Sequence, residues 1–159
     1  MEKTIKIDIP KGYEFAGVDN QQVVFEKINF QYPKTYEECC KILGVNPERI
    51  LTLNWRSENV LQRYELKAEG LFTNLYKLKI CRDAYWKLYG EQMRLGKPWE
   101  PDWNDCTQRK FGLYTLENEI RCINLQVLKN IILVFPTEEM RDVFYEHFKD
   151  LIEQCKELL

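Results

Sequence analysis

One stretch decides the fold of this chain, Leu66–Trp103, which reads LKAEGLFTNLYKLKICRDAYWKLYGEQMRLGKPWEPDW. Apolar residues in it recur at steps of three, four and seven, and the recurring set is Leu71, Leu75, Leu78, Tyr85 and Leu88. At about 3.6 residues per turn this spacing places them along one face, while most charged side chains lie off it. The pattern predicts one long amphipathic helix from Leu66 to about Tyr89.

Glycine and proline set the expected limits of this helix. An interior glycine costs about 1 kcal/mol relative to alanine, so a start just after Gly70 is an alternative. Gly90 and Gly96 are the expected stop signals, and Pro98 and Pro101 exclude helix from the segment beyond them. We therefore expect an irregular, aromatic-rich loop after the helix.

Upstream, the chain has the signals of a small sheet and short helices. Three segments have the composition of strands: Thr4–Ile9, Tyr13–Ala16 and Val23–Phe25. Thr35 followed by Glu38 has the form of a capping box, which predicts a helix over Tyr36–Leu43. Asn46 before Pro47 predicts a second short helix that reaches about Leu53.

Downstream, three strands and a helix are expected. The strand candidates are Lys110–Leu116, Ile120–Leu125 and Ile131–Phe135. Pro136 ends the last strand, and Thr137 is the N-cap of a closing helix from Glu138 to about Leu158. We expect both long helices to cover one face of the sheet, where Leu78 and Phe144 pack against Ile132 and Val134.

These elements predict an α+β fold with a small N-terminal β-meander, a long helix, a three-stranded antiparallel sheet and a long C-terminal helix. We expect the meander over residues 1–34, short helices and a connector over 35–65, and an α-β-β-β-α body over 66–159.

Composition excludes several classes of protein. The net charge of −2 and pI of about 5.6 argue against non-specific nucleic-acid binding. No apolar segment has the form of a signal peptide or approaches the ~20 residues that span a bilayer, so a cytoplasmic location is expected. Six cysteines stand without a CxxC spacing beside one histidine, so we expect reduced thiols and no metal site.

Parts of the sequence resemble a known group of proteins. The segments that carry the resemblance are TIKIDIPKGYE, QQVVFEKINF and YPKTYEEC near the start, CRDAYWKLYGEQMRLGKPWEPDW in the middle, and ILVFPTEEMRDVFYEHFKDLIEQCKELL at the end. They are similar to uncharacterised proteins encoded by prophages and mobile elements of gut bacteria. The resemblance implies a phage-type accessory or host-interaction protein and transfers no site residue.

Catalytic chemistry has few candidates. His147 is the chain's one histidine, and no nucleophile stands beside it in sequence. Glu100, Asp102 and Asp105 offer carboxylates for acid–base work, but Asx turns alone explain the positions of the two aspartates. No phosphate-binding glycine motif is present, and we expect no cofactor.

A candidate binding surface lies in the proline-stiffened loop and the helix before it. Its residues are Arg82, Trp86, Arg94, Trp99, Trp103 and Arg109. Tryptophan and arginine dominate interface hot spots, which favours a non-enzymatic protein that binds a partner protein through this aromatic loop or through the edge of the N-terminal hairpin.

Two further interpretations stay open. Arginines converging on the indoles would suit a small anionic or nucleotide-like ligand, held at a pocket between subunits of a homo-oligomer. Alternatively, Trp99 and Trp103 only lock the loop across the end of the long helix. An enzyme of unrecognised type is the last hypothesis, because no motif supports it.

Overall fold

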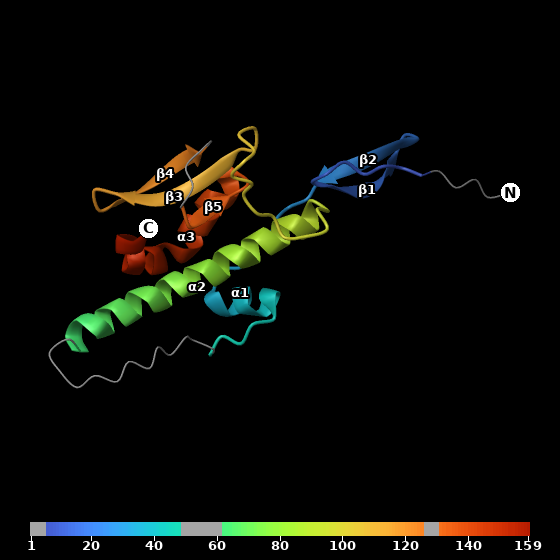
Figure 1. Ribbon diagram of the computed structural model, residues 1–159. Coiled ribbons are helices and arrows are strands. Elements are labelled where there is room, and N and C mark those ends of the chain that lie inside the picture. The colour runs from blue at the N-terminus through green and yellow to red at the C-terminus, as the bar shows by residue number, and fades with distance from the viewer. Residues whose placement is uncertain (1–5, 49–61, 126–130) are drawn as a thin grey trace.

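A 31-residue helix, α2 (Gln62–Gln92), runs along the whole body of the molecule, which we describe from a computed structural model (Figure 1). The structure describes residues 6–48, 62–125 and 131–159. The other elements are β1 (Tyr13–Asp19), β2 (Gln22–Lys27), α1 (Tyr36–Leu43), β3 (Lys110–Leu116), β4 (Glu119–Leu125), β5 (Leu133–Phe135), α3 (Glu138–Cys155) and a 3₁₀ turn, η1 (Lys156–Leu158). The predicted α+β fold is confirmed.

Two separate antiparallel sheets are present in the described part of the chain. One is the hairpin β1-β2, and the other has the strand order β4-β3-β5. Both hairpins turn through two residues with positive φ, Asn20 and Gln21 in the first (47° and 66°) and Glu117 and Asn118 in the second (52° and 66°). Such two-residue turns match the right-handed twist of the paired strands.

The core lies between one face of the larger sheet and the two long helices (Figure 1). Leu113, Leu133 and Phe135 project from the sheet towards Tyr85 of α2 and Phe144 of α3, and all five are buried. Cys39 and Cys40 of α1 are buried in the same core, so α1 packs with the body. Both long helices cover one face, as expected.

One detail of the expected packing is wrong. Val134 does not join the main core: it packs with Trp99 and with Trp86 of α2 in a second, smaller cluster, while its neighbours Leu133 and Phe135 join the main core. Side chains alternate between the two faces of a strand, so a strand that is buried throughout must be covered on both sides.

α2 begins and ends differently from the sequence-based expectation. The helix passes through Gly70, because packing along its length outweighs the cost of one glycine. It also passes through Gly90 and ends at Gln92. Just beyond this end, Arg94 adopts the left-handed conformation with φ 52°. The N–H of Leu95 donates to the carbonyl of Gly90 (2.8 Å) and that of Arg94 to Glu91 (3.1 Å), which is a Schellman motif.

Gly90 therefore serves a different purpose from a stop signal. A methyl group in its place would collide with the backbone of Lys97 and Pro98. The absence of a side chain lets the loop fold back onto the helix, where the N–H of Trp99 donates to the carbonyl of Trp86 (3.0 Å).

The N-terminal region also differs in part. The predicted strand Thr4–Ile9 is not formed over residues 6–9, and its first two residues lie outside the described ranges. Helix α1 has the predicted bounds and a complete capping box between Thr35 and Glu38. Most of the second short helix, 46–53, lies outside the described residues.

Aromatic side chains fasten the connector between β2 and α1 to α2. Tyr32 stacks on Tyr85 with ring centroids 4.7 Å apart, and Phe30 stacks on Tyr32 (5.6 Å). The hydroxyl of Tyr85 donates to the carbonyl of Pro33 (2.9 Å), and Nδ1 of His147 lies 2.8 Å from that hydroxyl and 3.0 Å from the same carbonyl. Burial raises the pKa of Tyr85, so its hydroxyl keeps the proton that it donates.

Two glycines of α2 predict opposite mutational effects. Gly90→Ala should lower the free energy of unfolding by about 2 kcal/mol, because the new methyl group displaces the loop backbone. Gly70→Ala should raise it by about 0.5–1 kcal/mol, because nothing lies within 4 Å of the added carbon. Urea unfolding followed by circular dichroism measures both, and equal effects would contradict the assigned role of Gly90.

Candidate functional site

The aromatic loop after α2 covers the second face of the larger sheet. Trp99 is only 7% exposed and packs on fully buried Val134. Trp86, Trp103 and Ile123 belong to this cluster, and the rings of Trp86 and Trp99 meet edge to face at 5.5 Å. The two loop tryptophans, together with Trp86 of α2, thus cover this second side of the sheet.

Arg82 and Trp86 bind backbone carbonyls just before and within the edge strand β5. Arg82 Nη1 donates to the carbonyl of Ile132 (2.6 Å), and Trp86 Nε1 donates to the carbonyl of Val134 (2.7 Å). Four residues of helix rise about 6.0 Å and two residues of strand about 6.6 Å, so the two repeats match. The guanidinium also lies 4.1 Å from the Trp86 ring and pairs with Asp83.

Hydrogen bonds within the loop fix its path. The Asp102 carboxylate accepts from the N–H of Asn104 (2.9 Å), and that of Asp105 accepts from the N–H of Thr107 (2.8 Å), which confirms the predicted Asx turns. The hydroxyl and N–H of Thr107 lower the pKa of Asp105. Lys110 is fully buried, and its Nζ donates to the carbonyls of Asp105 (2.7 Å) and Gln108 (3.0 Å). The carboxylates of Asp102 and Asp105 therefore accept hydrogen bonds within the loop.

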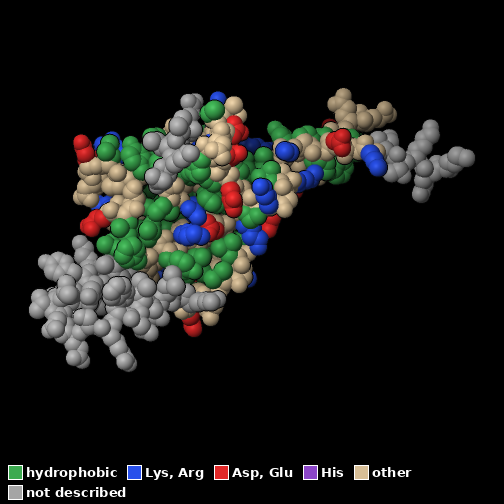
Figure 2. Space-filling view, viewed as in Figure 1, with side chains coloured by type: hydrophobic (Ala, Val, Ile, Leu, Met, Phe, Trp, Pro, Cys, Tyr) green, Lys and Arg blue, Asp and Glu red, His purple; other side chains and the backbone are tan. Residues whose placement is uncertain are grey.

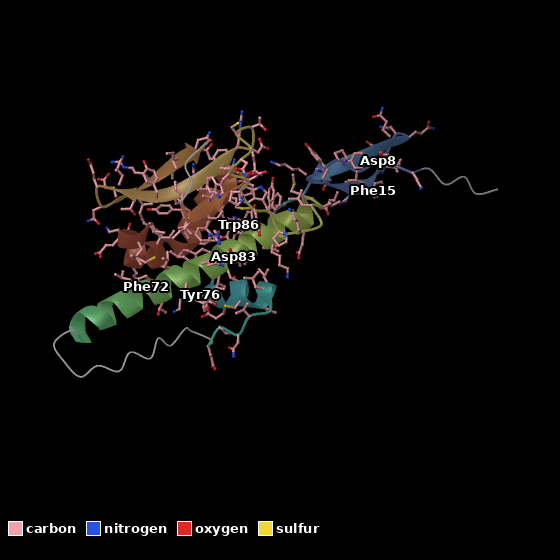
Figure 3. The ribbon with its side chains drawn as sticks, in the orientation of Figure 1. Asp8, Phe15, Phe72, Tyr76, Asp83 and Trp86 are labelled. Atoms are coloured by element: carbon pink, nitrogen blue, oxygen red, sulfur yellow. The ribbon has the colours of Figure 1, made fainter. Side chains whose placement is uncertain are left out.

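The six predicted site residues fall into separate places. Trp86, Trp99 and Trp103 share one cluster, and Arg82 stacks on it. Arg94 lies beyond the end of α2 and lines a pocket that includes neither of the other two arginines. Arg109 is exposed just before β3. Hence the three arginines do not converge on the indoles. Figure 3 shows Trp86 on α2, beneath the larger sheet.

A cavity of about 530 Å³ opens at the C-terminal end of α2. It is lined by Lys87, Gly90, Glu91, Arg94, Gly96, Lys97 and Pro98, and we call it the basic pocket. Two glycines in the sequence could have indicated this pocket. Gly90 lies where the loop backbone comes close to the helix, and Gly96 lies where the backbone turns with positive φ. Sequence reasoning assigned those glycines to helix termination instead.

The hairpin β1-β2 extends beyond that same end of α2 (Figure 1). Its pairing places Tyr13, Phe15, Val18, Val23 and Phe25 on one side, which we call the hairpin face, with Lys27 beside Tyr13. A bulge between Phe15 and Gly17 brings Val18 onto this side. Glu14, Asp19 and Glu26 lie on the opposite side together with one apolar residue, Val24, so charged residues predominate there.

Three residues of the hairpin face are exposed although they are apolar, while Val23 and Phe25 are half-buried. Tyr13 is 41% exposed, Phe15 54% and Val18 66%. Neither strand packs extensively on another described helix or strand. Phe15 is labelled in Figure 3, where it lies on the hairpin beyond the end of α2. Sequence alternation identified the strands, but only the register of the hairpin reveals that one side is apolar.

Comparisons with protein-family models, with curated proteins and with solved structures return no match. Within the described ranges, no three histidine, cysteine or acidic side chains are grouped so that they could hold a metal ion. None of the described helices has the length and apolar character needed to cross a membrane. All six cysteines are free, and Cys106 and Cys122 are the exposed ones.

Two of the predicted site residues should respond differently to substitution. Trp86→Phe is expected to lower the free energy of unfolding by about 2 kcal/mol, because the carbonyl of Val134 loses its donor and Arg82 loses its indole. Arg109→Gln, at an exposed position, is expected to change it by less than about 0.5 kcal/mol. Thermal and urea unfolding measure both. A Trp86→Phe protein as stable as the wild type would show that the hydrogen bond from Trp86 to Val134 and the stacking of Arg82 on the indole do not stabilise the fold.

Proposed function

We propose that this chain is a non-enzymatic interaction protein that binds a partner protein through the hairpin face. The observation that carries the proposal is the exposure of Phe15 and Val18, 54% and 66%, on a hairpin that has little support from the body. An isolated two-stranded hairpin is marginally stable in water, so a partner that covers its apolar side would stabilise it. The aromatic loop, the first candidate from sequence, is a weaker one because Trp99 is buried.

The size of the patch argues against a dimer formed by stacking two hairpin faces alone. With the exposures of Tyr13, Phe15 and Val18, the patch presents on the order of 300 Å² of side-chain surface. Two such faces stacked on each other bury roughly 600 Å², about half of the ~1,200 Å² at the lower end of stable interfaces. The partner must therefore contact additional surface beside the hairpin face.

The charges around the patch define the chemistry of that partner. Lys11 and Lys27 flank Tyr13, and Arg94 and Lys97 lie at the adjoining end of α2. Figure 2 shows basic side chains near the root of the apolar hairpin. A complementary partner segment combines apolar side chains with aspartate or glutamate. A phage-type accessory or host-interaction role, which the sequence resemblance implies, is compatible with such a module and is part of the proposal, as is the cytoplasmic location expected from the sequence.

A small anionic ligand is the second candidate function, and the basic pocket is the observation that favours it. However, none of the described residues that line that pocket is aromatic, so a nucleotide base finds no ring among them to stack on. The nucleotide-like version of this function has less support than a simple anion.

Selection from a displayed library of random peptides, carried out on the whole chain, tests the interaction function. Enriched peptides should combine apolar and acidic residues, and their affinity should fall at least tenfold when Phe15 and Val18 are both changed to serine. Changing Glu14 and Glu26 to serine, on the opposite side of the same hairpin, should leave affinity within about twofold. Interstrand nuclear Overhauser effects check that each hairpin still forms.

Two outcomes of that selection would count against the proposal. The first is the absence of any enriched peptide. The second is binding that both pairs of serine substitutions affect equally. Sedimentation equilibrium tests whether a second copy of the chain covers the hairpin face instead, and we expect a monomer at micromolar concentration. A dimer that the Phe15→Ser substitution dissociates would show that the hairpin face binds a second copy and not a partner protein.

A further inference from the structure

The basic pocket lies against the root of the hairpin. The turn at Gly12 approaches Met93, whose Sδ would be 3.4 Å from a carbon added to that glycine. Met93 directly precedes Arg94, which lines the pocket. The hairpin and the pocket thus lie at the same end of α2 (Figure 1), and a segment on the hairpin face that continues past Gly12 would run towards the pocket.

The pocket has an excess of positive charge. Lys87, Arg94 and Lys97 line it together with one acid, Glu91. Lys87 Nζ lies 3.9 Å from the carboxylate of Glu91 and donates to the carbonyl of Ile42 (2.7 Å). The positive charge of Lys87 is therefore offset by the negative charge of Glu91. Arg94 and Lys97 are both exposed, and neither has an ion-pair partner among the described residues. Their charges are available to a ligand.

The backbone that carries these two cations is held in place. Arg94 occupies the left-handed position of the Schellman motif, and Gly96 has φ 73°. The carbonyl of Lys97 packs against Gly90 of the helix. Cations on a fixed loop lose less conformational freedom when they bind than cations on a mobile one. The planar guanidinium of Arg94 suits two parallel hydrogen bonds to a carboxylate or a phosphate.

We infer that the basic pocket binds an acidic group of the partner segment, a carboxylate or a phosphate, through Arg94 and Lys97. This inference rests on the proposed function, since it assigns the polar half of the same contact. The cavity of about 530 Å³ is within the usual range for sites that take a small group. An acidic anchor here fixes the register of a segment whose apolar side chains lie on the hairpin face.

Titration of the isotope-labelled chain with inorganic phosphate and, separately, with acetate tests the pocket without a partner. Amide resonances of residues 87–97 should shift and saturate at millimolar ligand, with sodium chloride at equal ionic strength as the reference. Changing Arg94 and Lys97 to glutamine should weaken binding at least tenfold. The exposed Arg109→Gln variant is the matched control and should not change it. The tighter of the two anions identifies the acidic group as phosphoryl or carboxylate.

The results separate this inference from the function on which it rests. Shifts that persist in the double glutamine variant, or that spread evenly over the surface lysines, would overturn the anion site. Peptides that need Phe15 and Val18 but bind the double glutamine variant with unchanged affinity would also overturn it, while the interaction function stands. Phosphate or acetate binding that depends on Arg94, together with no peptide that needs Phe15, would overturn the interaction function and keep the pocket.

Discussion

The rest of this structure depends on a contact in which the spacing of two residues along helix α2 matches the spacing of two backbone carbonyls at strand β5. Arg82 and Trp86 stand four residues apart on α2, and the carbonyls that they bind, of Ile132 and Val134, stand two apart at the edge strand. Both steps cover about 6–7 Å, so each donor reaches one carbonyl. An unpaired strand edge invites association with other chains, and here a helix covers it.

This contact determines how both faces of the sheet are filled. With α2 fixed along β5, Tyr85 and Leu78 enter the main core beside α3, and the chain leaving α2 crosses to the opposite face. Gly90 permits that turn because the loop backbone lies directly against it. Trp99 then covers Val134, so a loop with the residue types of a recognition surface mainly completes the core.

The same geometry explains why the candidate site lies elsewhere. The donors of Arg82 and the indole N–H of Trp86 are engaged by backbone carbonyls, and the carboxylate of Asp105 is engaged by its own turn. Beyond the C-terminal end of α2, the hairpin carries exposed apolar side chains, and Arg94 and Lys97 are cations without a described ion-pair partner. These are the features on which the proposed contact with an apolar, acidic segment is based.

Local signals in the sequence determined the α+β class, the capping box that starts α1 at Tyr36, the N-cap at Thr137 and the Asx turns of the loop. Each of these depends on atoms within a few residues of one another, so a short stretch of sequence contains the whole interaction. Tertiary structure alone decided the role of Gly90, the side of the sheet that Val134 faces, and the one-sided apolar surface of the hairpin. These depend on which distant segment comes to lie beside each residue, and one-dimensional spacing does not encode that choice.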